Sequence, residues 1–169
     1  MSPVGPQLFT NVLDEHGAAL VLYAGQWCDT PEDVVQDALL KLVRQPAAPE
    51  NPVGWIYRVV RNGAISASRS TRRRSRREAA AAHHDEPWFV AVEGQRLDAV
   101  AAREALEQLP IEQRETIVAR LWGGLSYEQI AELTGSSTSS AHRWYQAGLS
   151  ALRERLGVRC PKKKNSLKA

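Results

Sequence analysis

Cysteine is scarce in this chain, and long apolar runs are missing. The two cysteines, Cys28 and Cys160, lie far apart without CxxC spacing, so the sequence indicates neither a disulfide framework nor a cysteine-based zinc site. No stretch approaches the roughly 18 consecutive apolar residues of a membrane-spanning helix, and the first residues lack the basic and apolar segments of a secretory signal. Nothing marks the chain for secretion or for crossing a membrane, and the reducing cytoplasm is its expected location.

Signatures of catalysis are also missing. The sequence has no nucleophile elbow, phosphate-binding loop or metalloprotease motif. His83 and His84 are adjacent but lack carboxylate or cysteine partners at ligand spacing, which argues against a metal site. We therefore expect a protein that is not an enzyme, with no catalytic residues, no cofactor and no metal.

The distribution of charge is more informative than its total. The formal net charge is only +3, but six arginines lie in 69–77 and five basic residues in 158–169. This leaves 11 of the 22 basic residues against 19 acidic ones in the rest of the 169-residue chain. Cations gathered in two short segments of an otherwise acidic protein predict a local contact with a polyanion, which could be DNA, RNA or an anionic membrane.

Residues 109–156 have the pattern of a helix-turn-helix preceded by a scaffold helix. Pro110 suits a first helical turn, and Gly123 or Gly124 can end that helix near 122. Ser126 and Gln129 have the spacing of a capping box at the start of a second helix of about two turns, and Gly135 supplies the sharp turn after it. Small residues on either side of this turn, at 131 and 141, let two helices cross closely, as in the DNA-binding form of the motif.

The third helix of this unit has an apolar face and a polar face. Its apolar or small residues recur at offsets of three and four, which predicts a stripe that faces the core. The stripe consists of Ala141, Trp144, Tyr145, Gly148, Leu149, Leu152 and Leu156. The other face carries short polar or cationic groups that can reach base edges and phosphates in a major groove. These candidate base-reading residues are Ser139, Ser140, His142, Arg143 and Gln146.

The first 77 residues predict three further helices. One covers 7–25; a second covers 30–44, with Thr30 as its N-cap and Pro31 in its first turn. In this second helix Val43 is expected to face inward, whereas Leu40 falls on the solvent side. Asn51 and Pro52 start the third by the same logic, and its exposed side leads into the arginine run, which favours a phosphate contact. The cationic and polar candidates on that side are Arg58, Arg61, Asn62, Arg69, Arg72 and Arg73.

The predicted fold is all-α, with two small helical domains joined by a linker. The apolar pattern fails between the domains, and a helix resumes at about Arg96 and continues to Gln108. The expected ranges are 7–77 for the first domain, 78–95 for the linker, 96–157 for the helix-turn-helix domain and 158–169 for a basic tail.

Two stretches together resemble the extracytoplasmic-function (ECF) group of bacterial sigma factors, the dissociable subunits that give RNA polymerase its promoter choice. The first comprises 31–42 (PEDVVQDALLKL) and 55–62 (WIYRVVRN), similar to the domain that binds polymerase and reads the −10 element. The second is 109–156, similar to the −35-reading domain, including 124–131 (GLSYEQIA) and 152–156 (LRERL). The family often has aspartate where this chain has Ser66, and 139–145 (SSAHRWY) replaces its usual Gly-Thr-Val opening. The resemblance is therefore to a divergent branch, and the −35 sequence cannot be carried over.

The resemblance implies a role for each surface. The outward face of helix 30–44 would dock on the clamp helices of the largest polymerase subunit, with the flap of the second-largest subunit as a further contact and promoter DNA as a partner. Asn62 matches the asparagine that holds a flipped −10 base, and the nearby arginines would follow the strand backbone. An anti-sigma factor is another partner of the family, and no membrane is expected among the partners. The polymerase-binding residues would be Asp33, Gln36, Asp37 and Leu40.

Two other classes of protein are alternatives. A stand-alone dimeric helix-turn-helix regulator would bind duplex DNA at a palindromic site through a self-association surface, and the pairing of two unlike halves argues against it. A helical RNA-modifying enzyme would use the basic run, and the missing catalytic constellation argues against that.

Overall fold

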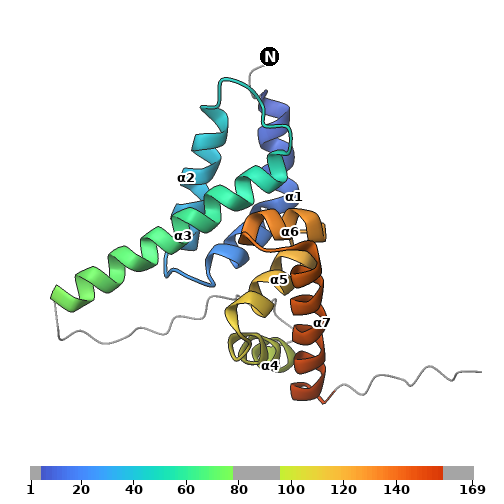
Figure 1. Ribbon diagram of the computed structural model, residues 1–169. Helices are drawn as coiled ribbons and strands as arrows, with labels where there is room; N and C mark the ends of the chain where they lie inside the picture. Colours follow the sequence, from blue (N-terminus) through green and yellow to red (C-terminus); the bar gives the residue numbers. More distant parts are fainter. Residues whose placement is uncertain (1–4, 78–95, 158–169) are drawn as a thin grey trace, which may run out of the picture.

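The computed structural model describes residues 5–77 and 96–157. Within these ranges the secondary structure is seven α-helices and no strand, as the all-α prediction requires (Figure 1). The helices are α1 (Pro6–Ala24), α2 (Pro31–Val43), α3 (Pro52–Arg77), α4 (Arg96–Glu107), α5 (Ile111–Leu121), α6 (Tyr127–Thr134) and α7 (Thr138–Arg155). The predicted linker, the His83-His84 pair, Cys160 and the basic tail lie outside the described residues.

The N-terminal half, α1–α3, packs around aromatic and aliphatic side chains that are almost fully buried. Tyr23 from α1, Leu42 from α2 and Ile56 from α3 have no exposed surface. Tyr57 of α3 is equally buried. Its ring lies edge-on to that of Tyr23, with centroids 5.1 Å apart, an arrangement that aromatic pairs favour.

The starts of α2 and α3 differ in how they are capped. Asn51 accepts a hydrogen bond at Oδ1 from the backbone N–H of Gly54 at 2.9 Å, so the predicted cap of α3 is confirmed. Thr30 is the N-cap of α2, but its side chain makes no capping hydrogen bond. Pro31 and the acidic first turn remain to favour this helix start.

The C-terminal half, α4–α7, contains the predicted helix-turn-helix. Ser126 Oγ accepts from the Gln129 N–H at 3.2 Å, and Gln129 Oε1 accepts from the Ser126 N–H at 2.8 Å, which confirms the capping box. Gly124 and Gly135 both have positive φ angles, +66° and +68°, which glycine adopts without steric cost. Pro110 differs slightly from expectation, because it is the N-cap of α5 and not its first helical residue.

Small residues let helix α7 approach α5 and α6 closely. Ala131 and Ala141 are buried at the α6–α7 crossing. Gly148 is buried opposite Ile117, and a Cβ atom built on it would lie 2.6 Å from Ile117 Cδ1. The predicted stripe is therefore only partly a core: Leu156, at its end, is 39% exposed.

Gly148→Leu should destabilise the C-terminal half by about 1–3 kcal/mol, because the new side chain would enter space that Ile117 fills. Urea denaturation followed by circular dichroism measures the change. The matched control is Ala147→Leu, which adds the same side chain at the neighbouring, exposed position. Equal stabilities of the two variants would contradict the close approach of α7 to α5.

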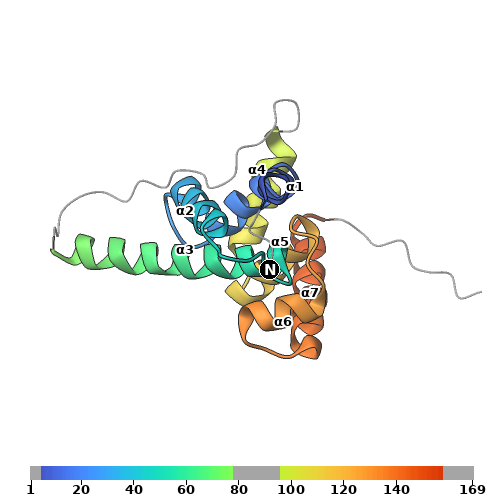
Figure 2. The ribbon, with the colours of Figure 1, turned by 90° about the horizontal axis from the view of Figure 1, so that it is seen from above.

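The two halves share a hydrophobic cluster, and a second, smaller cluster lies within the C-terminal half. Helix α1 contacts α5 and α3 contacts α6, and Figures 1 and 2 show α5 and α6 next to the N-terminal helices. The core cluster joins Tyr57 and Val60 of α3 to Val118, Leu125 and Ile130 of the C-terminal half. The sequence distinguishes two halves correctly, but it does not show that they bury apolar surface against each other.

Candidate DNA-binding and polymerase-binding surfaces

The polar face of α7 is open to solvent. Ser139, His142, Arg143 and Gln146 are exposed, while Ser140 is half-buried. The prediction that these side chains point away from the core therefore holds for four of the five and in part for Ser140. An exposed row of hydroxyl, imidazole, guanidinium and amide groups on the second helix of a helix-turn-helix is suited to reading base edges.

A serine network fixes the start of α7. Ser137 is the N-cap and accepts a hydrogen bond from the Ser140 N–H at 3.2 Å. The Ser137 hydroxyl also donates to Ser140 Oγ at 2.9 Å and lies 3.0 Å from Ser139 Oγ. Two of the five candidate base readers are thus hydrogen-bonded to the helix cap, whereas His142, Arg143 and Gln146 lie beyond it.

An aromatic cluster that the sequence analysis did not identify orients α6 against α7. The Tyr127 ring lies edge-on to His142, with centroids 5.1 Å apart, and to Tyr145 at 5.8 Å. The Arg120 guanidinium lies 4.8 Å from the Tyr127 ring centroid and donates to the Leu125 carbonyl at 2.7 Å. His142 and Tyr145 are three residues apart, a spacing that brings two side chains of a helix next to each other. This spacing was the one sign of the cluster in the sequence.

The outward face of α2 is exposed as predicted. Asp33, Gln36 and Asp37 are solvent-exposed, and Leu40 is 47% exposed. Val43, which was expected to face inward, is 49% exposed, so that expectation is wrong. Val43 lies three residues after Leu40 at the end of the helix, where no other described helix covers it, and the two form an apolar patch.

The C-terminal part of α3 projects away from the other helices in both views (Figures 1 and 2). Asn62, Arg69, Arg72 and Arg73 are exposed. The N–H of Arg73 Nε donates to the Arg69 carbonyl at 3.4 Å, one helical turn back. The Asn62 amide in the middle of α3 and the arginines farther along this helix together form a polar and cationic side that a single nucleic-acid strand can approach.

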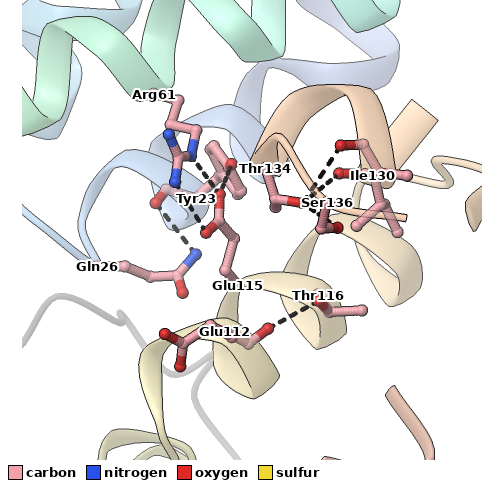
Figure 3. Close-up of polar contacts among 10 residues, drawn as sticks. Tyr23, Gln26, Arg61, Glu112, Glu115, Thr116, Ile130, Thr134 and Ser136 are labelled. Atoms are coloured by element: carbon pink, nitrogen blue, oxygen red, sulfur yellow. Dashed lines mark hydrogen bonds and ion pairs between the residues drawn. The ribbon is translucent and has the colours of Figure 1, made fainter. Parts of the chain in front are cut away.

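Arg61 differs from the prediction, because it is not an exposed cation. Its Nε donates to Glu115 Oε1 on α5 at 2.7 Å, and its Nη2 lies 3.4 Å from Glu115 Oε2. Tyr23 Oη donates to the same Oε1 at 2.5 Å, so α1, α3 and α5 meet at one carboxylate (Figure 3). Arg58 is exposed, but its Nη2 lies 3.7 Å from Glu132 Oε2 on α6.

The groups around Glu115 are removed from water. Glu115 is 3% exposed and Tyr23 fully buried. Burial, and after it the Glu115 carboxylate, raises the pKa of Tyr23 well above its usual value, which keeps the phenol protonated as a donor. Burial by itself lowers the pKa of Arg61, but the hydrogen bond and charge of Glu115 outweigh it, and the net pKa is raised.

Three further observations concern the described part of the chain. None of its helices has the length and apolar character needed to cross a membrane. The described residues include no group of three or more His, Cys, Asp or Glu side chains placed to hold a metal ion. Cys28 is buried and unpaired. The exposed polar side of α7 and the exposed amide and cationic side of α3 are the candidate binding surfaces of two unlike helical modules, and side chains of these kinds suit contacts with nucleic acid.

Comparison with known families identifies both modules. Sigma-70 region 2 matches residues 14–74, on α1–α3, and Sigma-70, region 4 matches residues 99–152, on α4–α7. The two matches together span well over half of the chain, in the order that the sequence resemblance predicted. The chain belongs to the sigma-70 family, and its resemblance to the ECF sigma factors is confirmed.

Solved structures share the arrangement of the helices. The sigma factor RpoE from Bartonella quintana, in complex with the anti-sigma factor NepR, is 22% identical, with a TM-score of 0.63 over 92% of this chain and 100% of RpoE. CnrH, in complex with the cytosolic domain of CnrY, is 20% identical, with a TM-score of 0.63 over 93% of this chain and 92% of CnrH. At these identities the likeness shows the fold. No curated protein sequence matches the chain.

Proposed function

We propose that this chain binds core RNA polymerase and directs it to promoters by contacting their −35 and −10 elements. The observation that carries the proposal is the coexistence of two exposed binding surfaces on one sigma-70 chain: the polar face of α7 and the amide and cationic side of α3. The protein would select where transcription starts without making or breaking a bond itself, in the cytoplasm where polymerase acts.

Each surface has a separate task in this proposal. The α2 patch centred on Leu40 docks on the clamp helices of the largest polymerase subunit, with the flap of the second-largest as a further contact. The face of α7 with His142, Arg143 and Gln146 enters the −35 major groove. Asn62 holds an unstacked −10 base, and Arg69, Arg72 and Arg73 follow its strand.

An anti-sigma factor is a further proposed partner. NepR binds RpoE, which has the same fold as this chain. We expect a protein of the same kind to bind here, in competition with polymerase.

Co-elution with purified core polymerase, followed by binding of promoter fragments to the complex, tests the proposed function. A sigma factor should join polymerase with one copy per enzyme and bind duplex DNA far better in that complex than alone. A stand-alone dimeric regulator should instead bind a palindromic duplex without polymerase and elute as a dimer. Tight binding of that kind, with no association with polymerase, would refute the proposal.

Arg143→Ala should weaken binding of the polymerase complex to its −35 element by about 1–3 kcal/mol and relax one base position. Arg143 is exposed on the reading face of α7 and can contact a guanine edge. Binding to a set of single-base −35 variants measures both effects. Arg153→Ala, an exposed arginine near the end of the same helix, is the control and should leave base preference unchanged. An equal loss on every sequence would show that Arg143 contacts only phosphate.

A further inference from the structure

The two arginines of α3 nearest to the C-terminal half are both paired with carboxylates of that half. Glu115 holds Arg61 through two of its guanidinium nitrogens, and Glu132 lies 3.7 Å from Arg58. Both arginines are candidates for the −10 strand backbone, and a guanidinium that contacts a carboxylate in this way cannot offer the same N–H groups to a phosphate. Arg69, Arg72 and Arg73 are exposed farther along α3.

The surroundings of Glu115 make its contact stronger than that of Glu132. Glu115 is 3% exposed, and its Oε1 accepts hydrogen bonds from both Arg61 and Tyr23. The Arg58 and Glu132 side chains are 54% and 66% exposed. Ion pairs as exposed as this one contribute little to the stability of a fold. The Arg61 guanidinium also lies 5.9 Å from the centre of the Trp27 ring, which covers it further. Glu115 therefore makes the main polar contact between α5 and the helices α1 and α3, a boundary that we call the seam.

The seam around Glu115 is closely packed. A Cβ atom on Gly123, just after α5, would lie 2.6 Å from Tyr57 Oη of α3. Arg114 Nη2 reaches the carbonyl of Gln26, just after α1, at 3.5 Å. Contacts on both sides of Glu115 thus hold α5 and its C-terminal turn against α1 and α3. We call this arrangement, in which the two halves are packed together, the closed conformation.

We infer that Glu115 is an intramolecular latch: it takes the place of a DNA phosphate at Arg61 and holds the free protein in the closed conformation, so that Arg58 and Arg61 become available only when the two halves separate. The closed conformation follows from the contacts above. The competition with DNA rests on the proposed function of α3. The two parts are therefore tested by separate measurements.

Distance measurements test the latch without any polymerase or DNA. Spin labels at Glu15→Cys and Glu154→Cys, exposed sites on α1 and α7, are introduced in the full chain with Cys28→Ala and Cys160→Ser. This labelled protein, with Glu115 unchanged, is the parent. Double electron–electron resonance should give one narrow distribution of the distance between its two labels. Glu115→Gln removes the charge that holds Arg61, and should shift the closed-to-open ratio about tenfold toward broad, longer distances. A broad distribution in the parent, or an unchanged one in Glu115→Gln, would overturn the latch.

Two further variants keep the test decisive. Glu112→Gln makes the same change of charge on α5 at an exposed position, where the side chain points away from Arg61 (Figure 3), and should leave the distances unchanged. Opening by this variant as well would overturn the specific role of Glu115. Tyr23→Phe removes one hydrogen bond to Glu115 and keeps its charge, and should open the chain to a smaller extent. Should Glu115→Gln not fold by circular dichroism, Tyr23→Phe decides: closed distances identical to the parent would overturn the latch.

Salt dependence tests the competition with DNA. Fluorescence anisotropy with a mixed-sequence single-stranded oligodeoxynucleotide measures binding to the full-length chain. Glu115→Gln should bind about tenfold more tightly than wild type, with a log–log salt slope steeper by about 0.7 for each arginine set free. Glu112→Gln should keep the wild-type slope. Open distances without a steeper slope would overturn the competition and leave the latch standing.

Discussion

Replacing Gln36, Asp37 and Leu40 together by alanine should abolish co-elution of this protein with core RNA polymerase. All three side chains are exposed on the outer face of α2, and Leu40 is the apolar centre of that face at 47% exposure. Truncating an apolar anchor and its polar neighbours at an interface removes several kcal/mol, so we expect affinity to fall at least about a hundredfold. The fold should remain, because the Asp37–Lys41 ion pair at 2.6 Å, which this variant removes, is exposed and stabilises the helix only slightly.

The chain offers a closely matched control on α1. Asn11, Leu13 and Asp14 are also an exposed amide, leucine and carboxylate, and Leu13 is 43% exposed. Their triple alanine variant removes the same chemistry from another surface and should bind polymerase as well as wild type does. Biolayer interferometry and size-exclusion chromatography measure both variants. Unchanged affinity of the α2 variant, or an equal loss in the α1 variant, would show that α2 is not the docking face.

Asn62→Ala should reduce open-complex formation by about ten- to a hundredfold without weakening association with polymerase. Asn62 is exposed on α3, and its amide can both donate to and accept from the edge of an unstacked base. The loss corresponds to about 1–3 kcal/mol, the cost of one specific base contact. Permanganate footprinting of melted thymines, on a promoter found by start-site mapping, measures it.

Ser66→Ala is the control for Asn62→Ala. Ser66 is exposed one helical turn farther along α3, and its hydroxyl has no role in the proposed capture of a base. This variant should form open complexes as wild type does. A loss as large as that of Asn62→Ala, or normal melting by Asn62→Ala, would contradict base capture by Asn62.

Local features of the fold could be predicted from the sequence because their causes lie within a few residues. The Ser126–Gln129 capping box, the left-handed Gly135 and the Asn51 cap depend on contacts three residues apart or on one φ angle. Exposure of Leu40 follows from helical periodicity. The expectation that Val43 faces inward is wrong because periodicity says which side of a helix is apolar, but not whether another helix covers its last turn.

The contact at Glu115 could not be predicted in the same way. Arg61 and Glu115 are 54 residues apart, and periodicity carries no information about which distant element covers a helix face. One local signal existed: Glu115 lies four residues after Ile111 and three before Val118, so a carboxylate stands on the apolar stripe of α5. A carboxylate in that register predicts a buried cationic or hydroxyl partner. It does not identify the partner as Arg61, and it therefore leaves Arg61 assigned to the exposed side of α3.

The latch would connect this contact to the proposed function. In the closed conformation the reading face of α7 and the α2 patch are exposed, whereas Arg58 and Arg61 are paired. Polymerase that holds the two halves apart would thus free cations for the −10 strand only within the assembled complex. Such coupling would keep the unbound protein from binding single strands nonspecifically.

In vitro transcription with purified core polymerase tests the central claim most directly. Genomic DNA is transcribed by core polymerase alone and with this protein added, and the 5′ ends of the transcripts are mapped. The account predicts new, discrete start sites that appear only with the protein and share two upstream sequence elements at a fixed spacing. The same start sites with and without the protein, although it is folded and present in excess, would contradict the account.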